Sequence, residues 1–228
     1  SIAAQVSLNP KGVLGLATGS TPIGTYRQLV EWYQKGELDF GKAVSINLDE
    51  YCGLSGDHPQ SYRRFMRENL FNHINIPTDR SFLPDGTQTD STLECARYDR
   101  IIEEHTGIDL QLLGIGRNGH IGFNEPDSCF ACGTHQVILT ESTIAANTRF
   151  FENEAQVPRQ AYSMGMQAIM QAKRVLLLIA SGADKAEAIR NSFFGPVTPQ
   201  VPASILQLHR DVIVIADEAA LADCPAEA

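Results

Sequence analysis

The sequence lacks a basic cluster and a long apolar run, and its cysteines form no regular pattern. Its 228 residues contain five cysteines, an odd number scattered along the chain, so we expect no disulfide framework and a reducing compartment. Lys and Arg number 18 against 27 Asp and Glu, for a formal net charge of -9, and an acidic chain of this kind is not typical of nucleic-acid binding. The longest apolar run, residues 175–180, is too short to cross a membrane. We expect no signal peptide and no membrane span, and hence a soluble, cytoplasmic protein.

One pair of cysteines has the spacing of a metal site. Cys129 and Cys132 precede His135 in a Cys-x2-Cys-x2-His string, and thiolate and imidazole groups are zinc ligands. A tetrahedral site needs four ligands, and a second pair of Cys or His is missing from the neighbouring sequence. We therefore expect no metal, and we interpret these cysteines as buried and inert. A thiol pair that is sensitive to oxidation is the alternative.

Strand-like runs alternate with helical patterns along the whole chain. The expected strands are residues 13–17, 43–48, 108–113, 174–180 and 211–216, and the expected helices are residues 23–34, 60–73, 92–105, 161–172 and 183–194. This alternation predicts the α/β class, with a doubly wound, mostly parallel sheet covered by helices on both faces, as in Rossmann-like folds. No linker-like stretch divides the sequence, so we expect residues 1–228 to form a single domain.

The most informative segment is a Gly-rich loop that follows the expected strand 108–113. It contains Asn118, His120 and Glu125, and loops after the strands of open α/β sheets are where ligands bind. An imidazole exchanges protons near neutral pH, so His120 is a candidate proton shuttle, and Glu125 can accept the other ring N–H. The alternative is a histidine that is hydrogen-bonded for structural reasons only.

Asp49 has the same kind of position, directly after the expected strand 43–48. A carboxylate at the carboxyl end of a strand lies near the mouth of the sheet and could act as a base. The Asp49-Glu50 pair could instead be part of a solvated turn, which is the more common role of such residues.

The first expected strand leads into the turn Thr18-Gly19-Ser20-Thr21. We expect Thr21 to be the N-cap and Pro22 the first residue of the helix 23–34. Free amide groups and the positive end of the helix dipole would then face a small anion, most naturally a phosphate. A helix start that is capped and binds nothing is the alternative.

These segments belong to a series of ordered motifs in which the chain resembles the glucosamine-6-phosphate deaminases, within the superfamily of sugar-phosphate isomerases and 6-phosphogluconolactonases. The motifs are residues 16–22, 47–51, 61–62, 114–126, 147–151 and 202–209. The sibling lactonases typically carry Arg after the Asp-Glu pair and Ser-Leu-Phe-Pro in place of residues 123–126. Tyr51 and Glu125 therefore favour the deaminase branch.

The resemblance implies an enzyme that converts glucosamine 6-phosphate to fructose 6-phosphate and ammonia without a cofactor. In this family the counterpart of Asp49 moves the C2 proton to C1, and we expect His120 and Glu125 to open the sugar ring. The implied catalytic residues are Asp49, Asn118, His120 and Glu125. The implied substrate-binding residues are Thr18, Gly19, Ser20, Thr21, Gly114, Arg149 and Lys185. Arg149 and Lys185 would be the cationic partners of the phosphate, although either could be a solvated surface residue.

The chain departs from the best-known members at two places. Asn118 stands where many relatives have Asp, and its amide can orient a neighbour but cannot exchange protons at neutral pH. Members that are activated allosterically carry a basic Arg-x-Arg-x-Lys cluster where this chain has Gly133-Thr-His-Gln-Val137. We therefore expect no activation of that type, and a monomer or small homo-oligomer rather than a hexamer.

Some questions stay open at the level of the sequence. Family members typically have a further strand and most of a helix before the first motif, so we expect this domain to lack the first strand and part of the first helix. Lactone hydrolysis on the same fold is an alternative function, and a sugar-phosphate-sensing domain without catalysis is another. The preference between glucosamine and galactosamine epimers is also open. In each case the expected partner is a small sugar phosphate.

Overall fold

A six-stranded parallel sheet forms the centre of the computed structural model, which describes residues 1–179 and 182–225. The strand order is β4-β2-β1-β5-β8-β9, and every adjacent pair is parallel. The strands are β1 (Val13–Leu16), β2 (Val44–Asn47), β4 (Ser81–Phe82), β5 (Leu110–Leu113), β8 (Arg174–Ile179) and β9 (Val212–Ala216). The α/β prediction is confirmed, and each expected strand contains an observed one. Ala180, which ends one expected strand, lies outside the described residues.

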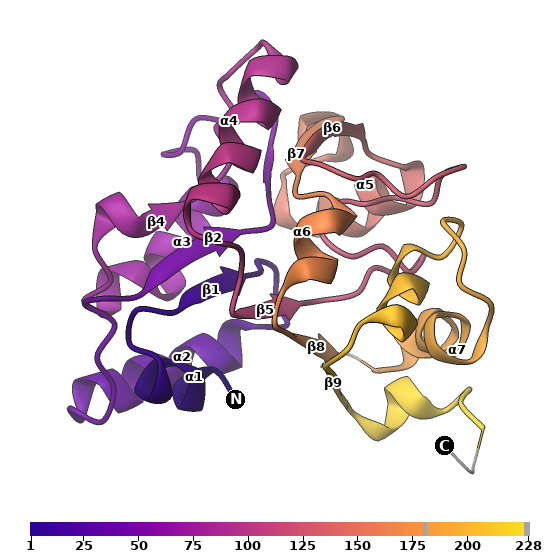
Figure 1. Ribbon diagram of the computed structural model, residues 1–228. Coiled ribbons are helices and arrows are strands. Elements are labelled where there is room, and N and C mark those ends of the chain that lie inside the picture. Colours follow the sequence, from indigo (N-terminus) through magenta and orange to yellow (C-terminus); the bar gives the residue numbers. More distant parts are fainter. Residues whose placement is uncertain (180–181, 226–228) are drawn as a thin grey trace.

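Helices cover both faces of this sheet. The α-helices of the described residues are α1 (Ile2–Leu8), α2 (Ile23–Gln34), α3 (Tyr62–Asn69), α4 (Ser91–Glu104), α5 (Glu141–Asn147), α6 (Met166–Gln171) and α7 (Ala186–Phe194), of which α5 packs beside the second sheet described below. Figure 1 shows α1 and α2 together on one side of the sheet and α4 and α6 on the other. Every residue of β1, β2 and β5 is buried, as parallel strands between two helical layers should be. The core of the protein therefore lies on both sides of these strands.

Several predicted helix boundaries need correction. The first of the expected helices, α2, begins at Ile23 with Pro22 as its N-cap, so the prediction of Thr21 as the cap was wrong. The expected helix 60–73 is α3 followed by a 3-10 turn at Phe71–His73, and the expected helix 183–194 begins with a 3-10 turn at Gly182–Lys185. These shifts leave the order of the elements unchanged.

A second, antiparallel sheet was not predicted from the sequence. It consists of β3 (Asp49–Tyr51), β7 (Gln160–Ser163) and β6 (His135–Ile138), in the order β3-β7-β6. The helix expected over residues 161–172 is therefore wrong in its first part, and only α6 remains of it. The solvated-turn alternative for Asp49 and Glu50 is also wrong, because both residues lie in a buried strand.

The connections of the main sheet create a crevice at its carboxyl edge. From β1 the chain passes through α2 to β2 on one side, whereas β5 pairs with β1 on the other. The loops after β1 and β5 therefore lead away from each other, which is where open α/β sheets bind ligands. In the described part of the chain, we find no helix with the length and apolar character needed to cross a membrane. The single-domain assignment of residues 1–228 stays a prediction.

Candidate active site

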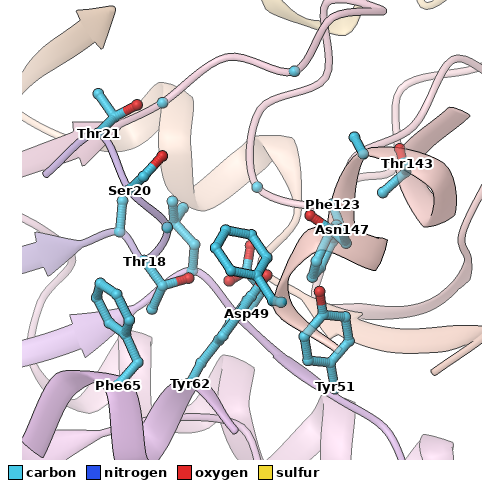
Figure 2. A pocket seen from close by; sticks show the side chains of 18 of the residues that line it. Thr18, Ser20, Thr21, Asp49, Tyr51, Tyr62, Phe65, Phe123, Thr143 and Asn147 are labelled. Carbon is cyan, nitrogen blue, oxygen red and sulfur yellow. The ribbon is translucent and has the colours of Figure 1, made fainter. Parts of the chain in front are cut away.

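A cavity of about 460 Å³ opens at this carboxyl edge. Figure 2 shows Asp49 near its middle, with Ser20 and Thr21 on one side and Thr143 and Asn147 on the other. The cavity brings together most of the residues that the sequence indicated, which are Thr18, Gly19, Ser20, Thr21, Asp49, Gly114, Asn118, His120, Arg149 and Lys185. Glu125 lies behind His120 and contacts its ring. The volume is in the range of small-ligand sites.

His120, Glu125 and Asn118 form one hydrogen-bonded group in the loop after β5. His120 Nδ1 lies 3.3 Å from Glu125 Oε2, and Asn118 Nδ2 donates to the same oxygen at 2.6 Å. Burial alone would raise the pKa of Glu125, but the hydrogen bonds and charge of His120 and the bonds from Thr143 and Asn118 lower it to about 2. Glu125 is therefore an anion at neutral pH, and it can hold the histidine ring in one orientation.

Two glycines allow the backbone of this loop to approach the side chains around the cavity. A Cβ on Gly116 would lie 2.5 Å from His120 Nε2, so only glycine leaves room for the imidazole ring there. Gly122 has a φ of +59°, and a Cβ at this position would lie 3.1 Å from Ser163 Oγ. That hydroxyl accepts a hydrogen bond from the Phe123 N–H at 3.0 Å, which joins the loop to β7.

Asp49 is only 6% exposed and lines the cavity from the start of β3. Burial, and secondly the negative charge of Glu50, raise the pKa of Asp49 to about 8. The aromatic rings of Tyr51, Tyr62 and Phe123 pack against one another beside it, at centroid distances of 4.8 to 5.9 Å. A carboxyl group in this setting can accept and return a proton near neutral pH.

Positive charge gathers at the end of the cavity next to the loop after β1. Arg149 Nη2 donates to Ser20 Oγ at 3.5 Å, and Lys185 lines the same cavity from the turn before α7. Burial, and then the charges of Arg117 and Arg149, lower the pKa of Lys185 to about 8. A cluster of cations in which two arginines lower the pKa of a lysine favours a doubly charged anion as its ligand.

Sequence reasoning missed three residues of this site. Arg117, in the Gly-rich loop, forms an ion pair with Asp184, the residue before Lys185. Thr143 Oγ1, on α5, lies 3.5 Å from His120 Nδ1, and Tyr62 lines the cavity from the start of α3. Arg117 could have been found from its place between Gly116 and Asn118. The other two lie in elements whose approach to the cavity is set by tertiary contacts.

The cysteine pair lies elsewhere and forms no metal centre. Cys129 and Cys132 are both exposed, so the prediction that they are buried and inert was wrong. Cys132 Sγ donates to Gln167 Oε1 at 3.0 Å. Among residues 1–179 and 182–225, no three His, Cys, Asp or Glu side chains are grouped so that they could hold a metal ion.

A family profile and individual relatives point to the same group of proteins. The profile of a family described as "Glucosamine-6-phosphate isomerases/6-phosphogluconolactonase" matches residues 2–215. A glucosamine-6-phosphate deaminase of Lachnoclostridium phytofermentans is 61% identical over 214 residues, which cover 94% of this chain and 90% of the relative. A glucosamine-6-phosphate deaminase of Clostridium perfringens is 55% identical, with 95% and 89% of the two chains covered.

Solved structures resemble this chain to different degrees. A structure described as that of "a monomeric glucosamine-6-phosphate deaminase" superimposes with a TM-score of 0.94 at 46% identity, covering 97% of this chain and 92% of the other. A 6-phosphogluconolactonase from Trypanosoma brucei superimposes with a TM-score of 0.73 at 20% identity, covering 98% and 90%. At that identity, the likeness to the lactonase concerns the fold alone.

Proposed function

The chain belongs to the family of glucosamine-6-phosphate isomerases and 6-phosphogluconolactonases, and we propose that it catalyses the isomerising deamination of glucosamine 6-phosphate. The products are fructose 6-phosphate and ammonia. The observation that carries the proposal is the placement of a buried carboxyl group, Asp49, in the same cavity as the His120–Glu125 pair and a cluster of cations.

In the first step, His120 opens the sugar ring. It takes the proton of the anomeric hydroxyl and returns a proton to the ring oxygen as the C1–O5 bond breaks. Glu125 accepts a hydrogen bond from the Nδ1–H group of His120, which leaves Nε2 free to face the substrate. Asn118 holds Glu125 in place, because its amide Nδ2 donates a hydrogen bond of 2.6 Å to Glu125 Oε2.

In the second step, Asp49 moves a proton from C2 to C1 of the open-chain sugar. The carboxylate removes the C2 proton while O1 takes a proton from the substrate's own ammonium group, which gives an enolamine. The same carboxyl group then protonates C1, and the nitrogen lone pair forms the C2 iminium. The resulting iminium at C2 adds water and releases ammonia, which leaves the ketose phosphate. A pKa near 8 makes Asp49 a stronger base than an ordinary aspartate, which suits the removal of a proton from carbon.

The phosphate of the substrate occupies the end of the cavity that is formed by the turn of residues 18–21. The backbone N–H groups in the first turn of α2 have no partner within the helix and can donate to the phosphate, and Arg149 and Lys185 supply charge-assisted bonds. Arg117 adds a third positive charge from the Gly-rich loop. The phosphate thus fixes the sugar so that C1 and C2 lie between Asp49 and His120.

An ammonia-release assay tests the proposed function. The purified protein should release ammonia and fructose 6-phosphate in equal amounts from glucosamine 6-phosphate. It should show no hydrolysis of 6-phosphogluconolactone above the spontaneous rate, because residues 123–126 are Phe-Asn-Glu-Pro and not the Ser-Leu-Phe-Pro typical of the lactonases. Lactone hydrolysis without ammonia release would overturn the proposal, and binding without turnover of either compound would point to a sensor.

Phosphate binding should depend on the charge of Lys185. This lysine loses its charge as the pH rises through about 8 in the free protein, whereas a bound dianion favours the charged form. The inhibition constant of inorganic phosphate should therefore increase above that pH, by up to about tenfold per pH unit, as phosphate binds more weakly. In the control variant Lys185→Arg, whose guanidinium stays charged, this pH dependence should disappear. An identical loss of affinity in both proteins would rule out Lys185 as its origin.

Asn118→Asp should retain activity but change its pH dependence. The new carboxylate would lie at hydrogen-bonding distance from Glu125 Oε2, and two carboxylates this close share a proton because their charges repel. We expect the pH optimum of kcat to move upward, since this extra negative charge favours the protonated forms of the neighbouring acid-base groups, Glu125 and His120. Asn118→Ala removes the same hydrogen bond without adding charge, and it should lower kcat with no such shift. Superimposable pH profiles for the wild type and Asn118→Asp would contradict the coupling.

We further propose that the protein acts as a monomer or a small homo-oligomer on a small amino sugar phosphate. The segment Gly133–Val137, which contains the start of β6, lacks the basic cluster of the allosterically activated relatives. The description of one similar structure as monomeric supports the same assignment.

A further inference from the structure

Asp49 and Glu50 are neighbours in β3, so their side chains point to opposite faces of the strand. Asp49 lines the cavity, whereas Glu50 is 2% exposed and faces the beginning of α3. Two carboxyl groups that are adjacent in the sequence thus have different surroundings. The mechanism described above uses only the first.

Glu50 accepts a set of backbone hydrogen bonds that ties β3 to α3. Its Oε1 accepts from the N–H groups of Tyr51 at 2.9 Å and Tyr62 at 2.8 Å, and its Oε2 accepts from that of Arg63 at 2.9 Å. The N–H groups in the first turn of a helix have no partner within the helix, and the helix dipole favours an anion at this end. Burial raises the pKa of Glu50 to about 7, and the three bonds, followed by the positive charge of Arg63, limit the rise because they favour its charged form.

The helix that Glu50 holds forms a wall of the cavity. Tyr62 and Phe65 of α3 both line it (Figure 2). The ring of Tyr62 stacks on that of Phe123 at 5.9 Å and packs against Tyr51 at 4.8 Å. Glu50 therefore fixes the aromatic surroundings that exclude water from Asp49.

The charge of Glu50 also acts on Asp49 directly. Besides burial, it is the cause that raises the pKa of Asp49. Three phenols are also coupled to Asp49, from Tyr51 on β3, Tyr62 on α3 and Tyr98 on α4, and burial raises the pKa of each above its usual value, so all three are neutral. His120, Arg149 and Lys185 line the same cavity, and none of them supplies a negative charge. Glu50 thus supplies a negative charge where its neighbours supply none.

We propose that Glu50 is a positioning residue for the deamination reaction, because it holds α3 against β3 beside Asp49. Its negative charge also makes Asp49 a stronger base. The proposal rests on the proposed function, because it assigns Glu50 a role toward Asp49 as the base. Glu50 itself touches no substrate in this assignment. Its two contributions, hydrogen bonding and charge, can be separated by substitution.

Glu50→Gln keeps the size of the side chain and one acceptor oxygen but removes the charge. Because Asp49 acts as a base only when it is ionised, kcat at saturating substrate, where the bound phosphate keeps Lys185 charged, rises with pH through the pKa of Asp49. The midpoint of this rise should move to lower pH by about one unit in Glu50→Gln, and kcat on the plateau should fall several-fold because a weaker base removes the proton more slowly. Glu50→Asp keeps the charge but withdraws it from α3, so it should raise KM and lower Tm. The midpoint of the pH-dependent rise should shift less than in Glu50→Gln.

Glu94→Gln is the matched control for the loss of a buried glutamate. Glu94 on α4 is also 2% exposed, is paired with Arg97, and is not among the causes of the shifted pKa of Asp49. Its substitution should leave the midpoint unchanged. An unmoved midpoint in Glu50→Gln would overturn the role of the charge, and unchanged KM and Tm in Glu50→Asp would overturn the role in positioning α3.

A titration of the side-chain carboxyl groups by carbon-13 NMR tests the charge effect without turnover. In the wild-type protein, Glu50 should ionise at lower pH than Asp49, and in Glu50→Gln the Asp49 midpoint should fall. Ionisation in the reverse order would overturn the proposal even if Glu50→Gln failed to fold. A protein that showed these titrations but released no ammonia would instead contradict the proposed function, so the two failures are distinguishable.

Discussion

Replacing Asp49 with Asn should lower kcat by roughly 10³-fold or more, because general base catalysis by a positioned group commonly contributes about 10²- to 10⁴-fold and here one group performs two proton transfers. An amide of the same size cannot accept the C2 proton. The substitution also removes a buried carboxyl group whose pKa burial raises, so we expect the fold to be retained. The phosphate end of the cavity should bind as before.

Exchange of the C2 hydrogen with solvent deuterium measures this step separately from ammonia release. In Asp49→Asn the exchange should vanish together with turnover, while the inhibition constant expected for inorganic phosphate is the wild-type value. That constant also serves as the control for folding. Retained C2 exchange in the variant would assign the base to another group, and lost phosphate binding would indicate a structural role for Asp49.

Replacing His120 with Gln should reduce kcat/KM on glucosamine 6-phosphate by about 10²- to 10⁴-fold, the range for the loss of a general acid-base group. The loss arises because the closed pyranose needs proton transfers at the anomeric hydroxyl and the ring oxygen. A glutamine side chain can still donate a hydrogen bond, but it cannot exchange a proton.

A substrate that cannot close into a pyranose separates ring opening from the later steps. On 5-deoxyglucosamine 6-phosphate, His120→Gln should lose much less activity than on the natural sugar. Asp49→Asn is the internal comparison, because it should be equally inactive on both compounds. Equal losses for His120→Gln on the two substrates would place His120 in the proton transfer at C2 or in holding the loop.

The parts of the fold that follow local patterns were predicted from the sequence. The strand runs and the helix Ile23–Gln34 were found because apolar runs and helical periodicity are properties of neighbouring residues. The second sheet was missed because β3 has only three residues and its partner β7 comes from a distant part of the chain. Residues 161–163 read as the start of a helix, and pairing with β3 and β6 overrode that local preference.

The sequence by itself determined which chemical groups this protein has and near which strand ends they lie. It placed Asp49, His120 and the turn of residues 18–21 after separate strands, and the parallel order of those strands brings their carboxyl ends to one edge. The tertiary structure alone decided how these groups titrate. Burial raises the pKa of Asp49, and hydrogen bonds lower that of Glu125. The burial of Asp49 depends on the packing of elements that are far apart in the chain, and the hydrogen bonds that Glu50 accepts from α3 join two separate elements. The hydrogen bonds of Glu125 come largely from its own loop, and their geometry depends on how that loop folds, which no local pattern encodes.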